Sequence, residues 1–251
     1  MKRQIILVTG AASGIGAAIA RRLAGPECCL LLHTGRNETG LAEVAEAARG
    51  QGADVETTFG DLSDPSVPPA LVARAQADFG GLDQIVSNAG HAQKARFGEI
   101  VDADLQHAFD IMPLAFFRLV SAALPLLQAS SRGRVVAISS FVAHRHGANG
   151  MLFPATSAAK AALEALAAEL AWQLAPDGVT VNCVAPGFVR KDAPRNGATS
   201  RSAMEEAARV VPLGRIGTPQ DIAGMVAYLL SEEAGHVTGQ TLHVNGGLTL
   251  A

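Results

Sequence analysis

The chain has 251 residues and a formal charge of −3, with 49% hydrophobic and 17% charged residues. This length fits one large domain, and the low share of charged residues argues against disorder. The charge balance gives no support for nucleic acid or an anionic membrane as partner, and no apolar run approaches the roughly 18 residues of a membrane span. We therefore expect a single domain over residues 1–251.

The cysteines and histidines show no metal-binding pattern. Cys28, Cys29 and Cys183 lack the spacing of metal ligands, and the seven histidines form no recognised motif. The N-terminal segment also becomes rich in glycine too early for a signal peptide. These features predict reduced core thiols in a cytoplasmic protein, without a metal site.

Apolar runs that contain β-branched residues alternate with stretches of helical spacing along the whole chain. Seven runs predict strands: 4–10, 28–35, 54–61, 82–90, 133–140, 179–187 and 240–247. Six stretches between them predict helices: 15–24, 38–50, 66–79, 103–128, 156–174 and 219–231. This alternation predicts parallel strands joined by right-handed crossovers. The fold class is therefore α/β, a single doubly wound (Rossmann-type) parallel sheet of about seven strands with helices on both faces.

One segment breaks the alternation. Residues 187–217 are rich in Gly, Pro, Ser and Arg, with only a short helical patch near 202–210. Because this segment follows a strand end, where such sheets bind ligands, we interpret it as a substrate lid. A plain surface excursion is the alternative. Its basic residues could meet an anionic substrate or simply face solvent: Arg190, Lys191, Arg195 and Arg201.

A glycine-rich turn joins the first predicted strand to the first helix. Gly10, Gly14 and Gly16 permit a tight turn and a close backbone approach to a diphosphate, which the amides of the helix start would bind. Three glycines alone are a weak signal, but their place between a strand and a helix favours dinucleotide binding over a mere turn. At the end of the second strand stands Arg36, where a carboxylate would favour NAD. A guanidinium suits a 2′-phosphate, so we expect NADP, with NAD or a solvated arginine as alternatives.

Taken together, these motifs resemble those of the short-chain dehydrogenase/reductase family over essentially the whole chain. The matches are the T-G-x-x-x-G-I-G pattern at 9–16, S-N-A-G at 87–90, I-S-S at 138–140, V-N-C-V-A-P-G at 181–187 and the C-terminal segment at 212–247. The resemblance implies a nicotinamide cofactor, a small-molecule substrate and a homo-oligomer, tetramer or dimer. It implies these cofactor-binding residues: Gly10, Ser13, Gly14, Ile15, Gly16, Arg36, Asp61, Leu62, Asn88, Ala89, Gly90, Lys160, Pro186, Gly187 and Val189.

The resemblance also implies the catalytic positions, and here the chain departs from the family. The serine is Ser140 and the lysine is Lys160, but the tyrosine four residues before the lysine is replaced by Thr156. The family's asparagine corresponds best to Asp110. A threonine hydroxyl does not titrate near neutral pH as an activated phenol does, although it can donate a hydrogen bond. His144 and His146 are conceivable substitutes, but each fits a polar surface loop better.

Lys160 lies in an alanine-rich helix, and a lysine buried there without a partner is costly. A cofactor ribose or Asp110 would be such a partner, and a stem that reaches solvent is the alternative. A group of apolar residues suggests a substrate pocket, although core packing could explain each: Phe97, Phe141, Met151, Leu152 and Phe153.

Three functions follow from these patterns. The first is an NADP-dependent oxidoreductase that transfers hydride to or from a carbonyl or alcohol, with altered proton donation. The second is a non-redox isomerase, dehydratase or lyase that keeps the cofactor. The third is a non-enzymatic nucleotide-binding or partner subunit. Loss of the tyrosine favours the latter two, whereas retention of Ser140, Lys160 and the glycine turn favours the first two.

Overall fold

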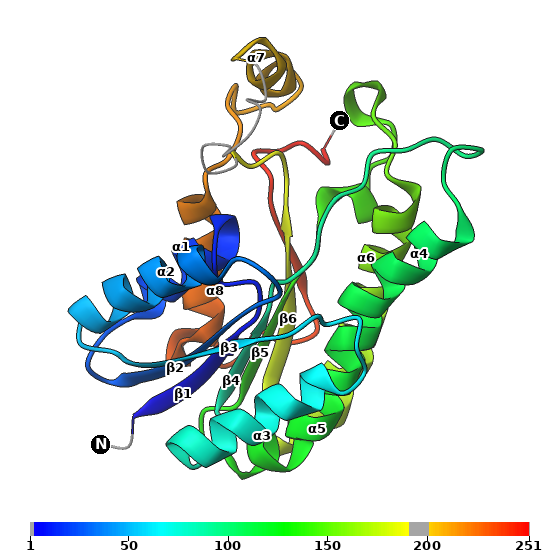
Figure 1. Ribbon diagram of the computed structural model, residues 1–251. Helices are drawn as coiled ribbons and strands as arrows, with labels where there is room; N and C mark the ends of the chain where they lie inside the picture. The colour runs from blue at the N-terminus through cyan, green and yellow to red at the C-terminus, as the bar shows by residue number, and fades with distance from the viewer. Residues whose placement is uncertain (1–2, 191–200, 251) are drawn as a thin grey trace.

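A computed structural model describes residues 3–190 and 201–250 and shows one seven-stranded parallel sheet (Figure 1). The strand order is β3-β2-β1-β4-β5-β6-β7. Their bounds are β1 Gln4–Val8, β2 Cys28–Thr34, β3 Asp54–Phe59, β4 Gln84–Ser87, β5 Arg134–Ile138, β6 Thr180–Pro186 and β7 Thr241–Val244. Each lies within a run that the sequence predicted to be a strand, so the predicted doubly wound fold is confirmed.

Helices cover both faces of this sheet, α1, α2 and α8 on one face and α3, α5 and α6 on the other (Figure 1). Their bounds are α1 Gly14–Leu23, α2 Glu38–Gly50, α3 Val67–Phe79, α4 Asp102–Phe109, α5 Ala115–Ala129, α6 Pro154–Leu174, α7 Arg201–Arg209 and α8 Pro219–Leu230. Five helices match predicted stretches closely, α4 and α5 together occupy the sixth stretch, and α7 matches the short helical patch.

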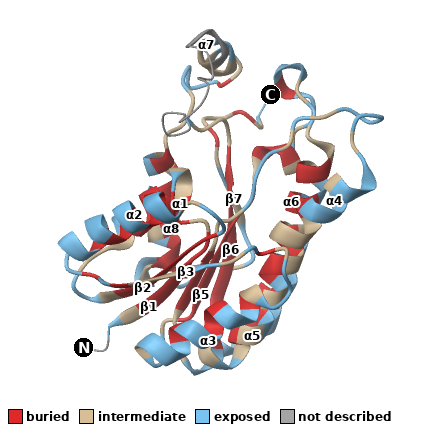
Figure 2. Ribbon diagram, in the orientation of Figure 1, coloured by how far each residue is buried: buried red, intermediate tan, exposed pale blue. Residues whose placement is uncertain are grey.

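The continuous apolar runs are explained by burial of the strands on both sides. In β1, Ile5 and Leu7 belong to the core under α3, α5 and α6, whereas Ile6 and Val8 belong to the core under α1 and α8. Successive side chains of a strand point to opposite faces, so a strand covered on both faces has no polar alternation. Figure 2 shows the strands as the buried centre of the molecule.

The strand order places a topological switch point between β1 and β4. The chain winds from β1 through β2 to β3 on one side, then continues from β4 towards β7 on the other. The connections after β1 and β4 therefore diverge, and they leave a crevice at the carboxyl ends of these strands. The glycine turn follows β1, and residues 87–90 end β4 and follow it, so both motifs lie at this crevice.

The helix predicted over residues 103–128 is interrupted. A π-helical segment, Asp110–Leu114, which contains Pro113, separates α4 from α5. By length and composition alone, the run Asp102–Ala129 could cross a membrane. Its buried residues, among them Phe116 and Leu119, pack in the core between α3 and α6, and this packing accounts for the apolar side of α5.

The two ends of the segment predicted to be a lid, residues 187–217, are hydrogen-bonded to each other just after β6. The N–H of Gly217 donates to Phe188 O at 2.7 Å, and the N–H of Arg190 donates to Gly217 O at 2.9 Å. Between these anchors lies α7, beyond the carboxyl end of the sheet (Figure 1). Lys191 and Arg195 lie outside the described residues.

Candidate active site

The glycine turn brings the start of α1 into contact with the end of β4. Gly16 packs so closely that an added Cβ atom would lie 2.2 Å from the Gly10 carbonyl oxygen and 2.6 Å from Asn88 Nδ2. Gly10 and Gly14 adopt positive φ angles of 65° and 55°, which favour glycine. An added Cβ atom at Gly14 would meet nothing within 4 Å. The turn is therefore packed tightly on its inner side and has open space at Gly14.

Hydrogen bonds from Asn88 fix the two sides of the crevice. Asn88 Nδ2 donates to Thr9 O at 3.0 Å and to Gly10 O at 3.1 Å. In return, Thr9 Oγ1 accepts the backbone N–H groups of Asn88 and Ala89, at 3.0 and 3.1 Å. The sequence predicted these residues to act at the cofactor, and the structure shows how they join the ends of β1 and β4.

The start of α1 has the properties of an anion site. The first amides of a helix lack intrahelical acceptors, and the helix dipole favours negative charge there. No acidic residue stands in the first turn of α1, and the exposed Ser13 makes no capping hydrogen bond through its side chain. With the space at Gly14, the turn and the amides around Ile15 fit the diphosphate of a dinucleotide.

Arg36 and Asp61 meet at the ends of β2 and β3. Arg36 Nη2 lies 3.7 Å from Asp61 Oδ2, and the arginine side chain is 92% exposed. Hydrogen bonds from Ser63 and, to a smaller extent, the charges of Arg36 and His107 lower the pKa of Asp61. Leu62 is buried in the core behind them. The guanidinium is therefore accessible at the crevice edge, where a phosphate could replace water around it.

Lys160 lies at the other end of the crevice and is buried. Its Nζ donates a hydrogen bond to Ile138 O at 2.5 Å, and the residue is 6% exposed. Burial lowers the pKa of Lys160 to about 8, although the nearby Cys183 and Glu164 partly oppose this effect. Near neutral pH the amine therefore exchanges its proton more readily than a surface lysine.

The expected partner of Lys160 is not Asp110. Asp110 Oδ2 accepts from Gln106 Nε2 at 3.2 Å, and Asp110 Oδ1 lies 3.9 Å from Arg118 Nη2. Asp110 and Lys160 both lie in the described part of the chain, and no ion pair joins them. The Asp110–Lys160 pair is therefore wrong, because the carboxylate turns toward α5.

Met112, in the middle of the π-helical segment, faces the crevice instead. A Cβ atom added at Gly90 would lie 3.2 Å from Met112 Cγ and Sδ and 3.4 Å from Lys160 Nζ. Met112 is 2% exposed and packs in a cluster with Ala155 and Ala159 of α6. A thioether thus borders the buried amine where a polar group was expected. Sequence reasoning missed Met112, although the adjacent Pro113 signals an irregular helix.

Ser140 and Thr156 flank the same end of the crevice. Ser140 follows β5, and its Oγ accepts the N–H of Val142 at 3.4 Å. Thr156, one helical turn before Lys160, is 2% exposed, and its Oγ1 accepts the N–H of Gln93 at 3.0 Å. The threonine hydroxyl therefore binds the backbone at Gln93, in the segment that follows β4, and its own O–H remains able to donate a hydrogen bond.

The two histidines considered as substitute acids have other partners. His144 Nε2 lies 2.9 Å from Glu164 Oε2, and its ring packs edge-on against His243 at a centroid distance of 4.5 Å. His146 Nδ1 lies 3.4 Å from Ser157 Oγ. Neither makes a hydrogen bond to Lys160 or Thr156, all four residues being described.

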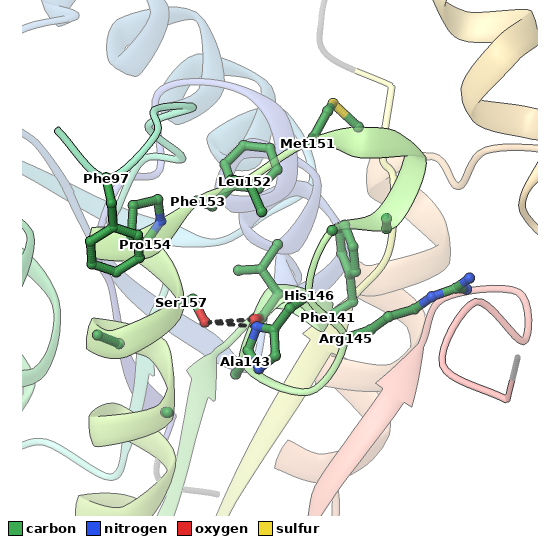
Figure 3. A pocket seen from close by; sticks show the side chains of 15 residues that line it. Phe97, Phe141, Ala143, Arg145, His146, Met151, Leu152, Phe153, Pro154 and Ser157 are labelled. Atoms are coloured by element: carbon green, nitrogen blue, oxygen red, sulfur yellow. Dashed lines mark hydrogen bonds between the residues drawn. The ribbon is translucent and has the colours of Figure 1, made fainter. Parts of the chain in front are cut away.

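The apolar residues expected to form a pocket do so. A cavity of about 420 Å³ lies between the start of α6 and the segment 141–153, next to Ser140 and Thr156 in the chain (Figure 3). Its apolar lining includes all five expected residues, namely Phe97, Phe141, Met151, Leu152 and Phe153. Ser140, Thr156 and Lys160 do not line it, so the cavity adjoins the catalytic positions without containing them.

The last of the expected cofactor residues lie where β6 ends. Pro186 is the last residue of β6, and a Cβ atom added at Gly187 would lie 2.8 Å from Asn245 Cβ. Val189 pairs with Gly217 at the anchor of the predicted lid. These residues face the carboxyl end of the sheet, as do the glycine turn and Lys160.

Comparisons with known proteins agree with this geometry. The family described as "Enoyl-(Acyl carrier protein) reductase" matches residues 10–249. The 3-oxoacyl-[acyl-carrier-protein] reductase FabG of Escherichia coli is 36% identical over 98% of this chain and 97% of its own length. A blue fluorescent protein from a metagenomic library, solved with NADPH, has a TM-score of 0.89 at 30% identity and 98% coverage of both chains. Acetoin dehydrogenase YohF of Salmonella typhimurium has a TM-score of 0.88 at 31% identity, covering all of this chain and 97% of its own.

Replacing Lys160 by Met should stabilise the cofactor-free protein more at pH 7 than at pH 10.5. The pKa of Lys160 is about 8 in the folded protein and has its ordinary value of 10.5 in the unfolded chain. As the pH falls from 10.5 to 8, the unfolded chain therefore binds a proton at this lysine before the folded protein does. The wild type therefore loses stability over this window, by roughly 3 kcal/mol, and the loss is constant below it.

Denaturant unfolding of Lys160→Met and wild type at both pH values measures this difference. Loss of the hydrogen bond to Ile138 O contributes equally at both and cancels. Lys94→Met, at an exposed lysine, is the matched control and should show no such pH dependence. If Lys160→Met changed the free energy of unfolding equally at pH 7 and pH 10.5, the low pKa of Lys160 would be contradicted.

Proposed function

The chain belongs to the short-chain dehydrogenase/reductase family of oxidoreductases, and we propose that it is an NADP-dependent member with altered proton donation. Hydride would pass between the nicotinamide and a carbonyl or alcohol substrate. The observation that carries the proposal is Lys160, whose amine is buried beside an intact glycine turn and has only a backbone carbonyl as hydrogen-bond partner among the described residues. A scaffold without a ligand has no need of this costly group.

Each residue of the crevice has a definite task in this proposal. The glycine turn and the start of α1 hold the diphosphate, Arg36 the 2′-phosphate and Lys160 a ribose hydroxyl. Ser140 orients the substrate oxygen through its hydroxyl. The nicotinamide, when bound, supplies or accepts the hydride.

Proton donation must differ from that of relatives with a tyrosine. Thr156 can donate its O–H to a substrate oxygen while it accepts from Gln93, but it cannot hold a charge as a phenolate does. Lys160, with a pKa of about 8, can restore a proton to that hydroxyl directly or through a water. The apolar sulfur of Met112 borders this route, which favours slow proton delivery.

The same two residues support a second candidate function. Thr156 leaves the crevice without a titrating hydroxyl, and Met112 places a thioether beside Lys160 where a polar partner was expected. A protein that keeps the cofactor but performs no redox turnover would tolerate both changes. Such a protein would be a non-redox isomerase, dehydratase or lyase, or a nucleotide-binding partner subunit.

The substrate of the oxidoreductase is a small carbonyl compound with an apolar part. The named relatives are a 3-oxoacyl-[acyl-carrier-protein] reductase and an acetoin dehydrogenase, both names that denote carbonyl or hydroxyl chemistry. The cavity beside Ser140 and Thr156 is lined mainly by apolar side chains, so it can receive an alkyl or aromatic group. The segment 187–217 would cover this substrate as a lid.

The protein functions in this proposal as a cytoplasmic homo-oligomer, a tetramer or dimer. Phe117 of α5 is 52% exposed and Trp172 of α6 is 84% exposed, on the two long helices through which the family assembles. Exposed aromatic side chains of this size are typical of interfaces. The free thiols of Cys28, Cys29 and Cys183 fit a reducing compartment.

Arg36→Ala should weaken NADPH binding and leave NADH binding unchanged. The guanidinium stands exposed at the strand end, and a charge-assisted hydrogen bond of about 1.5–3 kcal/mol corresponds to roughly a 10- to 100-fold loss of affinity. Fluorescence titration with both cofactors measures it. Arg21→Ala, at an exposed arginine in the last turn of α1, is the control. Equal wild-type affinities for NADPH and NADH would refute the preference for NADP.

Thr156→Tyr combined with Met112→Asn should raise the rate of ketone reduction by NADPH. General acid catalysis is worth about a hundred- to ten-thousand-fold, and Lys160 and Ser140 already define the place of a phenol. Suitable probes are an acetoacetyl thioester and acetoin, with NADPH oxidation as the readout. Because Thr156 is buried and bound by Gln93, the tyrosine also overpacks this site, at a cost of about 1–3 kcal/mol that thermal unfolding would reveal.

The control for this experiment is Thr156→Val, which keeps the shape of the side chain but removes the hydroxyl. It should abolish the slow activity of the wild type. Rapid wild-type reduction that Thr156→Val leaves intact would show that another group is the acid. Absence of any hydride transfer in both the wild type and the double variant, with NADPH bound, would favour the non-redox alternative.

A further inference from the structure

Two histidines outside the expected site stand beside the crevice. His91 follows Gly90 directly where the chain leaves β4, and His107 lies in the last turn of α4. Their rings have centroids 5.6 Å apart and planes tilted by 37°. Both come from elements at the carboxyl end of the sheet, and the sequence motif that ends at Gly90 gave no role to the residue after it.

The backbone that leads into His91 is positioned by its neighbours at the switch point. A Cβ atom added at Gly10 would lie 3.0 Å from Ala89 Cα, so the glycine turn touches the chain two residues before His91. Gly90 in turn borders Lys160 Nζ, at 3.4 Å from an added Cβ atom. His91 therefore emerges between the turn that would hold a diphosphate and the lysine that would hold a ribose.

His107 lies toward the adenosine end of the same crevice. Its charge acts on Asp61, which pairs with Arg36 at the ends of β2 and β3. It also acts on Asp104, one turn earlier in α4. The ring pair therefore lies within electrostatic reach of Asp61 through His107 and of Lys160 through His91, the two regions that a phosphate-bearing dinucleotide would connect.

We infer that His91 and His107 bind phosphate groups of the cofactor and that at least one of them takes up a proton when the cofactor binds. This inference rests on the proposed function and adds two ligand-binding residues to it. Imidazolium donates charge-assisted hydrogen bonds to phosphate oxygens through either ring nitrogen. Without cofactor, the neutral form is favoured at the exposed His91, since partial desolvation and then the charges of His107 and Lys160 lower the pKa of His91.

The direction of the pH dependence follows by linkage. A bound phosphate favours the protonated imidazole and raises a pKa that is low in the unbound protein, so binding takes up a proton. Cofactor affinity should therefore increase as the pH falls from 8 to 6. The charge of His107 acts on Asp61 and Asp104, whereas Lys160 and His107 oppose charge on His91.

The test compares NADPH affinity at pH 8 and pH 6 in the wild type and in His91→Gln, His107→Gln and the double variant. Glutamine keeps a hydrogen-bonding side chain but cannot become a cation. The wild type should gain about 10-fold more affinity than the double variant over this range. Titration of Lys160 and of the cofactor phosphate affects all variants alike, so the difference between the curves isolates the histidines.

His236→Gln is the matched control, because this exposed histidine precedes β7 at the opposite edge of the sheet. Its curve should follow that of the wild type, and thermal unfolding should confirm that each variant is folded. NADH provides the second arm of the test. A histidine effect with both cofactors assigns the contact to the diphosphate, and an effect with NADPH alone assigns it to the 2′-phosphate.

Parallel curves for the wild type and the double variant, with normal binding, would overturn the histidine inference and leave the proposed function intact. Failure of the folded wild-type protein to bind either cofactor at any pH would overturn both.

Discussion

The rest of this site depends on a buried amine, Lys160, that forms no ion pair with a carboxylate of the described residues. Lys160 Nζ is held against the backbone of β5 by one hydrogen bond, with the sulfur of Met112 nearby. Burial of a cation under these conditions costs free energy, which appears as a lowered pKa. A bound dinucleotide would supply the hydroxyl and phosphate groups that the protein lacks there. A bound cofactor would therefore supply the polar partners of Lys160 that the described residues do not provide.

The crevice exists because β1 and β4 are held together at their ends. Gly16 permits the helix start to approach the Gly10 carbonyl, and Asn88 binds the same turn from β4. A side chain at Gly16, or loss of the amide at Asn88, would separate them. The same arrangement positions Gly90 against Lys160, so the phosphate turn and the buried amine form one unit.

Much of this could be predicted from the sequence because it depends on local pattern. The seven strands follow from apolar runs buried on both faces, and the glycine turn, Arg36 and Lys160 follow from motifs with a fixed spacing. The orientation of Asp110 could not be predicted, because a π-helical segment shifts the face that later residues present. The bond from Gln93 to Thr156 joins residues 63 positions apart, and no local pattern signals it. The ring pair of His91 and His107 likewise depends on how α4 packs.

The most direct test of this account is a pH titration of the lysine side chains by NMR with ¹³C-labelled lysine. The chain has only four lysines, at positions 2, 94, 160 and 191, so the signals can be assigned by single substitutions. One signal, absent in Lys160→Met, should titrate near pH 8 and move when NADPH is added. Titration of the Lys160 signal near the ordinary lysine value of about 10.4, with no response to NADPH, would contradict the central claim.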